Sequence, residues 1–532
     1  MTGLYNFAPW YFRRREAIGF VSLCLIRMSK VPRKGEVFLD VSGRRIPLKL
    51  YLGGGIPLFS GLRLNVCKAL FRADEFSDAS IQNKVTLLDY AGDDGEEIHL
   101  RMPYDAFNRA KGRGRVASVL VLPDSATTLF FRQTEQNSLV ITVRNSMPAD
   151  ARRLRALMWV ARWVARFTPQ PGVTLLYEKE AAGYEESAKA VYEKLIDAGY
   201  GDAYFILDAA SPHRELIEKK YLPNIVDKDS FRHYLLFFRC KKFVGTEVIQ
   251  HAIGLRAASA SAIRKQQDIR KGKADFAFLQ HGVVCMLSFG MALREGLHKT
   301  GSGLRRVVVS SHQEARHFRE YAGYDEEDIY LSGLPKFDYS VLNPGADRIL
   351  IMPTWRRWEA NLMRQDAEKT RYFQLIQDML TAIPKELRTK VMIKPHPLFL
   401  SYLGSQKTVL DSYFVPGLSY DEALKETVLL ITDYSSIATD AFFRGANVLF
   451  YWEQLEECLA AYGEGASLIL DRDTIFGEVC YSTEELEELI PKYYLSPQPE
   501  EYRKRYRQVV EFDDRKNTER VIELLRKDGF VR

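Results

Sequence analysis

The stretch VLLITDYSSIATDAFFRG, residues 428–445, decides the fold of this chain. It begins with an apolar run of the length of a buried strand, turns at Ser435-Ser436 and continues as a helical pattern that ends at Gly445. A strand, a short turn and a helix together form one unit of a parallel sheet. Serines at a helix start cap its N–H groups, and those groups with the helix dipole can bind phosphate. Capping alone is the alternative interpretation of this turn.

Strand-like runs of the same kind recur along the chain, separated by helical segments. The first series is VTLLYE, AYFILD, KKFVGT and FAFLQHG, and the second, which begins near Arg305, includes RVVVSS, DIYLSG, RILIMPTW, KVMIKPHP and NVLFYW. Repeated strand–helix units predict a parallel sheet with helices on both faces. Two series in succession predict two Rossmann-like domains, with ligands bound where the carboxyl ends of their strands face each other.

The first part of the chain has a different pattern. Residues 1 to 147 contain short apolar runs, such as VFLDV, SVLVL and LVITVR, at the spacing typical of a small, mostly antiparallel β domain. The predicted fold class is therefore α/β, with two Rossmann-like domains and a β-rich N-terminal domain. The predicted divisions are the β-rich domain at 1–150, a linker helix at 151–171, the Rossmann-like domains at 172–303 and 304–495, and a helical cap at 496–532.

The linker helix predicted at 151–171 is basic and amphipathic. Helical spacing puts four arginines on one face, namely Arg152, Arg155, Arg162 and Arg166. The residues predicted on the opposite face are Leu154, Leu157, Met158, Ala161 and Ala165. Two interpretations fit this pattern: a helix packed on a domain with its arginines in water, or a helix adsorbed to anionic lipid, which Trp159 and Trp163 favour.

Composition indicates a globular protein of two or three domains. The 532 residues are 46% hydrophobic and 27% charged, the balance of a folded protein rather than a disordered one. A net charge of +6 is too mild to indicate nucleic acid. The six cysteines lie far apart without any CxxC, so neither a zinc site nor a disulfide framework is indicated, and a reducing cytoplasm fits best. We expect no signal peptide and no membrane-spanning helix.

Polar residues follow several of the predicted strands, which is where an open α/β sheet places its site. His281-Gly282 follow FAFLQ, at a tight turn where glycine lets a ligand or the next helix come close. Pro353-Thr354-Trp355-Arg356 follow RILIM and could offer a hydroxyl and a guanidinium group to a charged ligand, with a surface turn as the alternative. Lys394-Pro395-His396-Pro397 follow KVMI, and the prolines fix the direction of a histidine that is structural or functional.

The helix that follows Ser435 offers a carboxylate as well. Ser436 and Asp440 are four residues apart and share a helix face, so the carboxylate could reach a ligand hydroxyl held over the helix terminus. Asp433 would instead orient the loop. The chain has no GxxxxGK[ST], no GxGxxG and no DxD at a strand end. Their absence argues against a P-loop hydrolase, a nicotinamide dehydrogenase and a metal-dependent sugar transferase, and no metal site is predicted.

An ordered set of short motifs resembles the CDP-glycerol glycerophosphotransferases, the family of bacterial teichoic acid polymerases and primases. The resemblance extends over residues 172–525. Its motifs are YEKEAAGYEESAKAVYEKL near the start, QHG at 280–282, SGLPKFD at 332–338, MPTWR at 352–356, KPHP at 394–397, DYSSIATD at 433–440 and FDDRKNTERVIELL near the end.

The resemblance implies a GT-B fold whose second Rossmann-like domain binds the donor. It implies transfer of glycerol phosphate from CDP-glycerol to a hydroxyl of a lipid-linked or polymer acceptor, with release of CMP. His281 would be the base on the acceptor hydroxyl, and His396 would stabilise charge on the diphosphate. The candidate donor-binding residues are Gly282, Lys336, Pro353, Thr354, Arg356, Lys394, Ser435, Ser436 and Asp440. No cofactor and no nucleic acid are expected, the expected location is the inner face of the cell membrane, and homo-oligomerisation stays open.

The sequence departs from the usual motifs of the family at three places. QHGVV stands where WHGTP is usual, Lys336 where arginine is usual, and KPHP where RMHP is usual. Lysine meets phosphate without the bidentate fork of arginine, so CDP-ribitol or a related donor stays open. The alternatives are a GT-B glycosyltransferase or nucleotide-sugar epimerase, and a non-catalytic scaffold in a polymer-export assembly. The paired serines with Asp440 favour a CDP-alditol donor, and the two cleft histidines argue against a scaffold.

Overall fold

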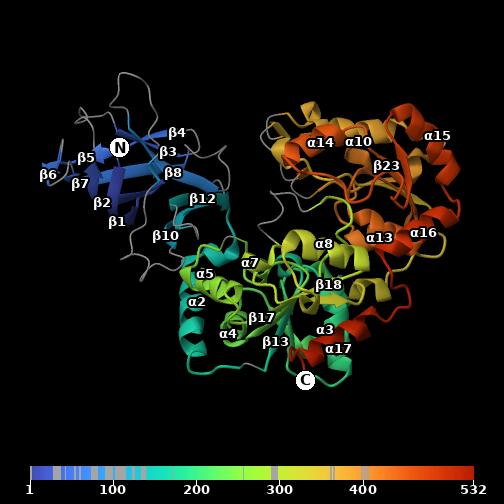
Figure 1. Ribbon diagram of the computed structural model, residues 1–532, viewed down its shortest axis with the longest axis horizontal. Helices are drawn as coiled ribbons and strands as arrows, with labels where there is room; N and C mark the ends of the chain where they lie inside the picture. Colours follow the sequence, from blue (N-terminus) through green and yellow to red (C-terminus); the bar gives the residue numbers. More distant parts are fainter. Residues whose placement is uncertain are drawn as a thin grey trace. The chain divides into compact units, whose positions relative to one another are not determined.

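The computed structural model (Figure 1) divides into two compact units, which are described separately. The first comprises Met1–Pro169, Asp229–Arg239 and Ile253–Asp268, and the second comprises Gln170–Lys228, Cys240–Ala252 and Ile269–Arg532. The residues that the structure describes are 3–27, 37–41, 44–52, 55–58, 62–73, 82–89, 100–101, 116–122, 126–133, 139–170, 172–255, 257–288, 297–359, 362–363, 366–396, 399–400, 403 and 406–532.

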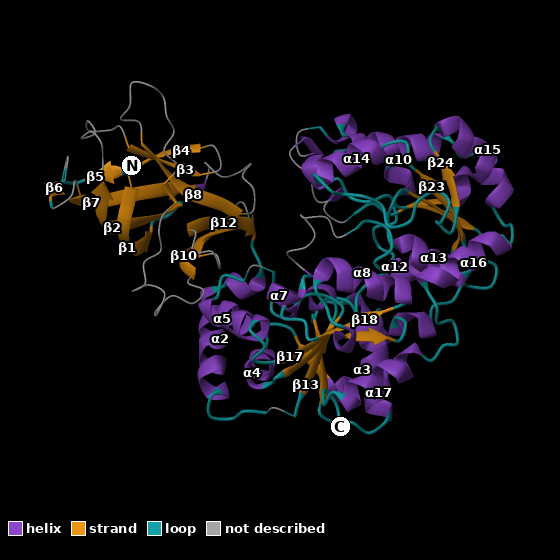
Figure 2. Ribbon diagram, viewed as in Figure 1, coloured by secondary structure: helices purple, strands orange, loops and turns teal. Residues whose placement is uncertain are grey.

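The β-rich part of the first unit is built from antiparallel sheets (Figure 2). One has the order β1-β2-β7-β5, with β6 beside β7, and the other has the order β10-β11-β12-β8-β3-β4, with β9 beside β8. The strands of the first sheet are β1 (Gly3–Arg13), β2 (Ala17–Arg27), β5 (Lys49–Leu50), β6 (Ile56–Pro57) and β7 (Leu62–Arg72). Those of the second are β3 (Val37–Val41), β4 (Arg44–Pro47), β8 (Gln82–Asp89), β9 (Leu100–Arg101), β10 (Val116–Leu122), β11 (Thr127–Gln133) and β12 (Leu139–Asn145).

Aromatic side chains join the two sheets of the first unit in one apolar core. Phe20 of β2 and Phe71 of β7 both pack against Phe131 of β11, with ring centroids 6.2 and 5.4 Å from that of Phe131. All three are buried, as expected where the inner faces of antiparallel sheets meet. The expected small, mostly antiparallel β domain is confirmed.

Among the described residues of the first unit, three helices accompany these sheets: α2 (Arg152–Ala165), α4 (Phe231–Arg239) and the greater part of α5 (Ala260–Arg270). The helix α2 forms where the linker helix was predicted, and it packs on α4. The buried residues of α2 are Met158, Ala161 and Ala165, from the face predicted to be apolar. A hydrophobic stripe at helical spacing thus explains both the helix and its packing.

The second unit begins with a parallel sheet whose strand order reverses near its middle. The order is β15-β14-β13-β16-β17-β18-β19, so the chain starts in the middle at β13, runs to one edge and then returns to build the other half from β16 onward. The strands are β13 (Thr174–Tyr177), β14 (Ala203–Leu207), β15 (Ile225–Asp227), β16 (Lys242–Gly245), β17 (Asp275–Phe278), β18 (Arg306–Val309) and β19 (Ile329–Leu331). In a sheet of this kind ligands bind beyond the carboxyl ends of the strands at the reversal, here β13 and β16.

A second parallel sheet in the same unit has the order β21-β20-β22-β23-β24. Its strands are β20 (Arg348–Ile351), β21 (Val391–Ile393), β22 (Thr427–Thr432), β23 (Asn447–Tyr451) and β24 (Glu478–Cys480). The reversal lies between β20 and β22. The helices that the structure describes in this unit are α3 (Ser187–Asp197), α7 (Lys299–Ser302), α8 (His312–Ala322), α10 (Arg371–Thr381), α12 (Tyr420–Lys425), α13 (Ile437–Arg444), α14 (Leu455–Tyr462), α15 (Thr483–Tyr493), α16 (Glu500–Val509) and α17 (Asn517–Lys527). Two Rossmann-like sheets are thus present, as the two series of runs predicted.

The division between these sheets differs from the predicted boundary at residues 303 and 304. The runs RVVVSS and DIYLSG form β18 and β19, which complete the first sheet rather than starting the second. Residues 229–239 and 253–268, predicted within the first Rossmann-like domain, belong to the first unit. Each run was assigned correctly as a strand, but a run does not show which sheet it joins, because pairing depends on segments far away in the sequence.

The C-terminal segment returns to the first sheet of the second unit. The helix α17 packs on α3, and the side chain of Thr174 in β13 donates to the carbonyl oxygen of Phe530 at 2.6 Å. Arg306 at the start of β18 pairs with Asp528. Between these, Tyr506 of α16 donates to the carbonyl oxygen of Thr439 in α13 at 2.7 Å. The segment predicted as a helical cap therefore contacts elements of both sheets. None of the helices in the described ranges has the length and apolar character to span a bilayer.

Candidate active site

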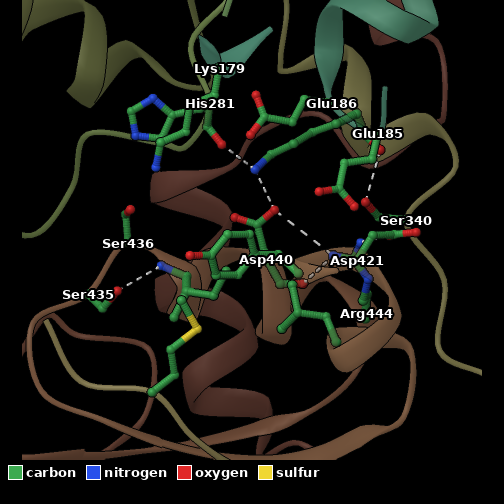
Figure 3. A pocket seen from close by; sticks show the side chains of 15 residues that line it. Lys179, Glu185, Glu186, His281, Ser340, Asp421, Ser435, Ser436, Asp440 and Arg444 are labelled. Carbon is green, nitrogen blue, oxygen red and sulfur yellow. Dashed lines mark hydrogen bonds and ion pairs between the residues drawn. The ribbon is translucent and has the colours of Figure 1, made fainter. Parts of the chain in front are cut away.

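A polar cavity of about 180 Å³ lies beyond the carboxyl ends of both sheets of the second unit (Figure 3). Its lining includes Glu185 and Glu186 before α3, His281 after β17, Lys336 after β19, and Ser435, Ser436 and Asp440 around the start of α13. A larger cavity of about 560 Å³ shares Lys179, Glu185, Glu186 and Tyr420 with it. Small-molecule sites usually measure about 300–1,000 Å³, so the two cavities together suit a nucleotide-sized ligand.

Two serines stand at the N-terminus of α13. Ser436 is the N-cap residue, but its hydroxyl makes no capping hydrogen bond, whereas Ser435 Oγ accepts the N–H of Ile437 at a long 3.5 Å. The first N–H groups of an α-helix have no partner within the helix, and with the dipole they favour an anion. The serines thus stand where both interpretations placed them, and the Ser436 hydroxyl faces the cavity rather than capping the helix (Figure 3).

The loop after β17 approaches this helix terminus closely at Gly282. A Cβ built on Gly282 would lie 3.1 Å from Ser436 Oγ, closer than in about nine of ten real contacts of a Cβ atom. A larger residue would push the serine or the loop aside. Gly282 therefore lets the loop that carries His281 meet the start of α13, which is the close helix approach expected of this glycine.

Lys336 ties the His281 loop to α13. Its Nζ lies 2.5 Å from Asp440 Oδ1 and donates to the carbonyl oxygen of His281 at 2.6 Å. Lys336 and Asp440 are both more than nine-tenths buried. Arg444 donates to the carbonyl oxygen of Asp440 at 3.0 Å and to Asp421 at 2.6 Å. Each of these buried charges along α13 therefore has an opposite charge within reach, which offsets the cost of its burial.

A buried glutamate shapes the backbone before His281. Gln280 has a φ of 60°, a left-handed conformation that is strained for a non-glycine residue. Its side chain donates to the carbonyl oxygen of Val308 at 2.6 Å and to Glu314 Oε1 at 3.0 Å, and Glu314 Oε1 also accepts the N–H of Val284 at 2.7 Å. Burial raises the pKa of the Glu314 carboxyl to about 7. These hydrogen bonds hold the strained turn and so fix where His281 leaves the sheet.

The side chain of His281 is 55% exposed and faces two glutamates of the first sheet. Its Nδ1 lies 3.3 Å from Glu247 Oε1, and Figure 3 shows it across the cavity from Ser436 with Glu186 nearby. Burial raises the pKa of the Glu186 carboxyl, although His281 and Lys336 beside it oppose the rise. A histidine so placed can exchange a proton with a group in the cavity.

The loops after β20 and β22 are joined by one buried carboxylate. Asp433 accepts hydrogen bonds from the N–H of Thr354 at 2.9 Å, from the Thr354 hydroxyl at 2.7 Å and from Arg356 at 2.8 Å. Arg356 also donates to the Tyr434 hydroxyl at 2.7 Å, and only 1% of its surface is exposed. The Thr354 hydroxyl and the Arg356 guanidinium are therefore engaged in holding the loop, so Asp433 orients the loop as the sequence suggested.

Neither His396 nor Lys394 lines the polar cavity. The His396 ring stacks on Trp355, with centroids 5.7 Å apart and an interplanar angle of 18°, and the backbone N–H of His396 donates to the Tyr372 hydroxyl at 3.2 Å. Burial, together with the positive charge of Lys179, lowers the pKa of His396 to about 4. The Lys394 ammonium lines the larger cavity and donates to the carbonyl oxygen of Leu418, and burial lowers its pKa.

The family is shown by a sequence match that covers most of the chain. The family described as CDP-glycerol:poly(glycerophosphate) glycerophosphotransferase matches residues 161–527. The chain belongs to this family. Among curated proteins, the minor teichoic acid biosynthesis protein GgaB of Bacillus subtilis (strain 168) is 26% identical over 361 residues, which are 63% of this chain and 38% of GgaB. The chain thus matches well under half the length of that relative.

Solved structures show the fold of this family member. The wall teichoic acid polymerase TagF superposes with a TM-score of 0.50 at 16% identity, over 71% of this chain and 96% of TagF. A histidine-to-asparagine variant of TagF soaked with CDPG matches equally well, over 94% of its length. At this identity the likeness establishes the fold alone. The GT-B arrangement of two Rossmann-like domains, expected from the resemblance, is confirmed.

The structure gathers some of the predicted site residues of this family member and separates others. His281, Lys336, Ser435, Ser436 and Asp440 line the polar cavity, and Gly282 contacts Ser436. Thr354 and Arg356 lie in the loop behind it, and the carbonyl oxygen of Pro353 accepts from the Tyr372 hydroxyl at 3.4 Å. Pro397 of the KPHP motif lies outside the described residues. No cluster of three or more metal-ligating side chains occurs in the described part of the chain.

Several charged residues at or near the site were not predicted from the sequence. Glu247 follows KKFVGT, so the rule that selected His281, a polar residue after a strand, could have found it. Glu178 and Glu186 lie in the first quoted motif; Glu178 accepts the N–H groups of Glu185, Glu186 and Lys189 at 2.9–3.0 Å at the start of α3. The same rule could not have found Glu314, because this residue lies inside a helix and not directly after a strand.

Proposed function

We propose that this transferase moves a glycerol phosphate unit from CDP-glycerol to a hydroxyl of a lipid-linked or polymer acceptor, and releases CMP. The observation that carries the proposal is the position of His281 across a polar cavity from the N-terminus of α13. One side offers a base and the other offers N–H groups, hydroxyls and a helix dipole for phosphate. The family and the names of its relatives support a teichoic-acid-like polymer as the product.

The chemistry follows from these positions. The N-terminus of α13 holds the diphosphate, and the acceptor hydroxyl lies between His281 Nε2 and the phosphorus that bears glycerol. As the acceptor oxygen attacks that phosphorus, its proton passes to His281, and the bond from phosphorus to the oxygen of CMP breaks with its electron pair on CMP. His396 donates a hydrogen bond to the diphosphate. Positioning and charge stabilisation thus supply most of the rate enhancement.

The first test is release of CMP from CDP-glycerol, with CDP-ribitol and UDP-sugars assayed in parallel in the presence of a short glycerol-phosphate acceptor. CMP from CDP-glycerol supports the proposal, and CMP from CDP-ribitol alone changes the alditol. Release of UDP from a sugar donor while both CDP donors stay inert would overturn the proposal and make the chain a glycosyltransferase.

For location, we propose that α2 binds the cytoplasmic face of an anionic membrane. The exposed side of α2 and the turn that follows it carry the aromatic residues Trp159, Trp163 and Phe167, which are 64%, 53% and 70% exposed. Arg152 and Arg166 are also exposed. The predicted basic face needs correction: Arg155 and Arg162 are partly buried, and Arg155 donates to the carbonyl oxygen of Asp150 at 3.1 Å. Aromatic side chains flanked by arginines suit the interface of an anionic bilayer.

The membrane proposal is tested with the paired substitutions Trp159→Ala and Trp163→Ala. We expect binding to vesicles of anionic lipid to weaken about tenfold or more, because each aromatic that enters the bilayer contributes on the order of 1–2 kcal/mol. Leu495→Ala is the matched control, since Leu495 is also an exposed apolar residue. If the double variant sediments with the vesicles as well as the wild type does, α2 does not bind the membrane and only packs on its own domain.

A further inference from the structure

The carboxylate of Glu247 lies next to His281, and a second histidine, His251, lies on the other side of that carboxylate. Glu247 follows β16, at the point where the strand order of the first sheet reverses. A Cβ at Gly245, the last residue of β16, would lie 2.5 Å from the ring of Tyr177, so only glycine lets that ring pack there. The Tyr177 hydroxyl donates to the carbonyl oxygen of Glu247 at 2.9 Å. The end of β13 thus fixes the backbone that carries Glu247.

Glu247 lies between two imidazole rings. One carboxylate oxygen, Oε1, is 3.3 Å from His281 Nδ1, and the other, Oε2, is 3.7 Å from His251 Nε2. The Glu247 side chain is 16% exposed and that of His251 is 10% exposed, whereas His281 extends into the cavity. The carboxylate therefore connects a fixed, buried ring to an exposed one.

The hydrogen-bond partners of His251 fix its tautomer. His251 Nδ1 accepts the N–H of Glu180 at 3.0 Å, so Nδ1 carries no hydrogen. Burial lowers the pKa of His251, which keeps the ring neutral at physiological pH. A neutral imidazole with an accepting Nδ1 has its hydrogen on Nε2, and this hydrogen faces Glu247. At 3.7 Å this N–H is too far from Glu247 Oε2 for a hydrogen bond, and it acts on that oxygen only as a dipole, whereas Glu247 Oε1 lies nearer to His281 at 3.3 Å.

We propose that Glu247 is the positioning residue for His281, and that the N–H dipole of His251 favours the orientation of Glu247. Glu247 accepts the Nδ1–H of His281, which selects the tautomer whose Nε2 lone pair faces the cavity. Nε2 is then the atom that takes the proton of the acceptor hydroxyl, and the carboxylate stabilises the imidazolium that forms. This inference rests on the proposed role of His281 as the base and adds the reason why its reactive nitrogen faces the cavity.

The decisive variant is Glu247→Gln, which keeps the size of the side chain. Glutamine has one accepting oxygen and one donating NH₂ group, whereas both histidines present an N–H to this position. One ring must therefore turn or change tautomer. We expect kcat to fall about 100-fold, within the range that general acid–base catalysis contributes. The KM for CDP-glycerol should change less than about threefold, because Glu247 does not contact the donor site on α13.

His251 supplies a conservative pair of variants. His251→Gln keeps an N–H donor toward Glu247 and should retain most of the activity, whereas His251→Ala removes it and should lower kcat about tenfold. Glu326→Gln is the control, because Glu326 is an exposed glutamate that pairs with Arg319 far along the chain from these groups. A purely structural role of Glu247 and His251 would lower folded content and kcat together, which circular dichroism and thermal melting of each variant detect.

Nitrogen NMR of the full chain labelled with ¹⁵N-histidine tests the tautomer without any substrate. The His281 signals are identified by their loss in His281→Asn. Hydrogen on Nδ1 of His281 in the wild type, and its loss or shift in Glu247→Gln, support the proposal. Hydrogen on Nε2 in the wild type, or a Glu247→Gln enzyme within about twofold of wild-type kcat, would overturn it. If the wild type releases no CMP from any donor, the proposed function fails while the NMR result still decides whether Glu247 orients His281.

Discussion

The two parallel sheets of the second unit end in loops of different chemistry. Beyond β13, β16 and β17 lie ionisable side chains: Glu186 and His281 line the cavity, and Glu247 faces His281. Beyond β20 and β22 the charged pair Arg356 and Asp433 is buried in the loop, and the cavity is met by hydroxyls and the start of α13. In the proposed mechanism, two sheets of the same architecture therefore have different roles: the first supplies groups that can move a proton, and the second supplies a rigid site for the diphosphate.

The largest effect that tests this division is expected at His281. His281→Asn should lower kcat about 1,000-fold or more, because a general base contributes on the order of 10²–10⁴. Binding of CDP-glycerol, measured by calorimetry, should stay within about threefold of wild type, since the proposal places the donor on the loops of the other sheet. If the His281→Asn variant keeps a kcat near that of the wild type, the base is a different residue, and the first sheet does not supply it.

The second effect concerns the buried pair behind the anion site. Asp433→Asn leaves the Arg356 guanidinium in the core with no carboxylate beside it, which should cost about 3–5 kcal/mol in the free energy of unfolding. Urea unfolding measures the loss, and Asp473→Asn, at an exposed position, is the control. A loss below about 1 kcal/mol would mean that water reaches Arg356 and that the loop is not a rigid support.

A smaller effect, on the KM for the donor, is expected from a substitution at Ser436. Ser436→Ala removes a hydroxyl that lines the cavity without capping α13. The KM for the donor should rise about fivefold with little change in kcat, the equivalent of one hydrogen bond of about 1 kcal/mol. Thr381→Ala removes an exposed hydroxyl from α10 as a control. If kcat falls while KM stays unchanged, Ser436 stabilises the transition state, and the second sheet contributes to catalysis as well as to donor binding.

The smallest effect is a dependence of donor binding on pH through His396. Its pKa of about 4 keeps the ring neutral at pH 7, and a bound diphosphate favours the charged ring, so the pKa rises on binding. Affinity for CDP should therefore increase a few-fold as pH falls from about 7 to 5, with proton uptake visible in calorimetry across buffers. The same group lowers the stability of the free protein as pH falls from 6.5 towards 4, because the unfolded chain binds the proton more readily. His396→Asn should abolish the proton uptake; uptake that persists would belong to another group.

Much of the site was predictable because parallel strands bring their carboxyl ends together. His281 follows β17 and Ser435 follows β22, and that rule alone predicted that they lie near one cavity. The rule does not say which way a polar side chain turns. Thr354 and Arg356 also follow a strand, yet they turn inward to Asp433, because a buried carboxylate needs donors.

The helix α2 also shows that sequence patterns do not fully predict the direction of side chains. Helical periodicity predicted its extent and its buried Met158 and Ala161 correctly. Periodicity did not predict that Trp159 and Trp163 would be the exposed residues while Arg155 is partly buried. Which side of a helix is covered depends on the width of its partner, here α4, and that partner lies far along the chain.

The sequence by itself determined the α/β class, the two series of strands, the family and the short motifs that carry His281, Ser435 and Ser436. These features are local, since strand length, helix periodicity and the residue after a strand depend on neighbours in the chain. Only the tertiary structure decided that β18 and β19 belong to the first sheet and that Glu247 lies between His251 and His281. Hydrogen-bond partners, burial and side-chain direction are set by segments that meet only when the chain is packed.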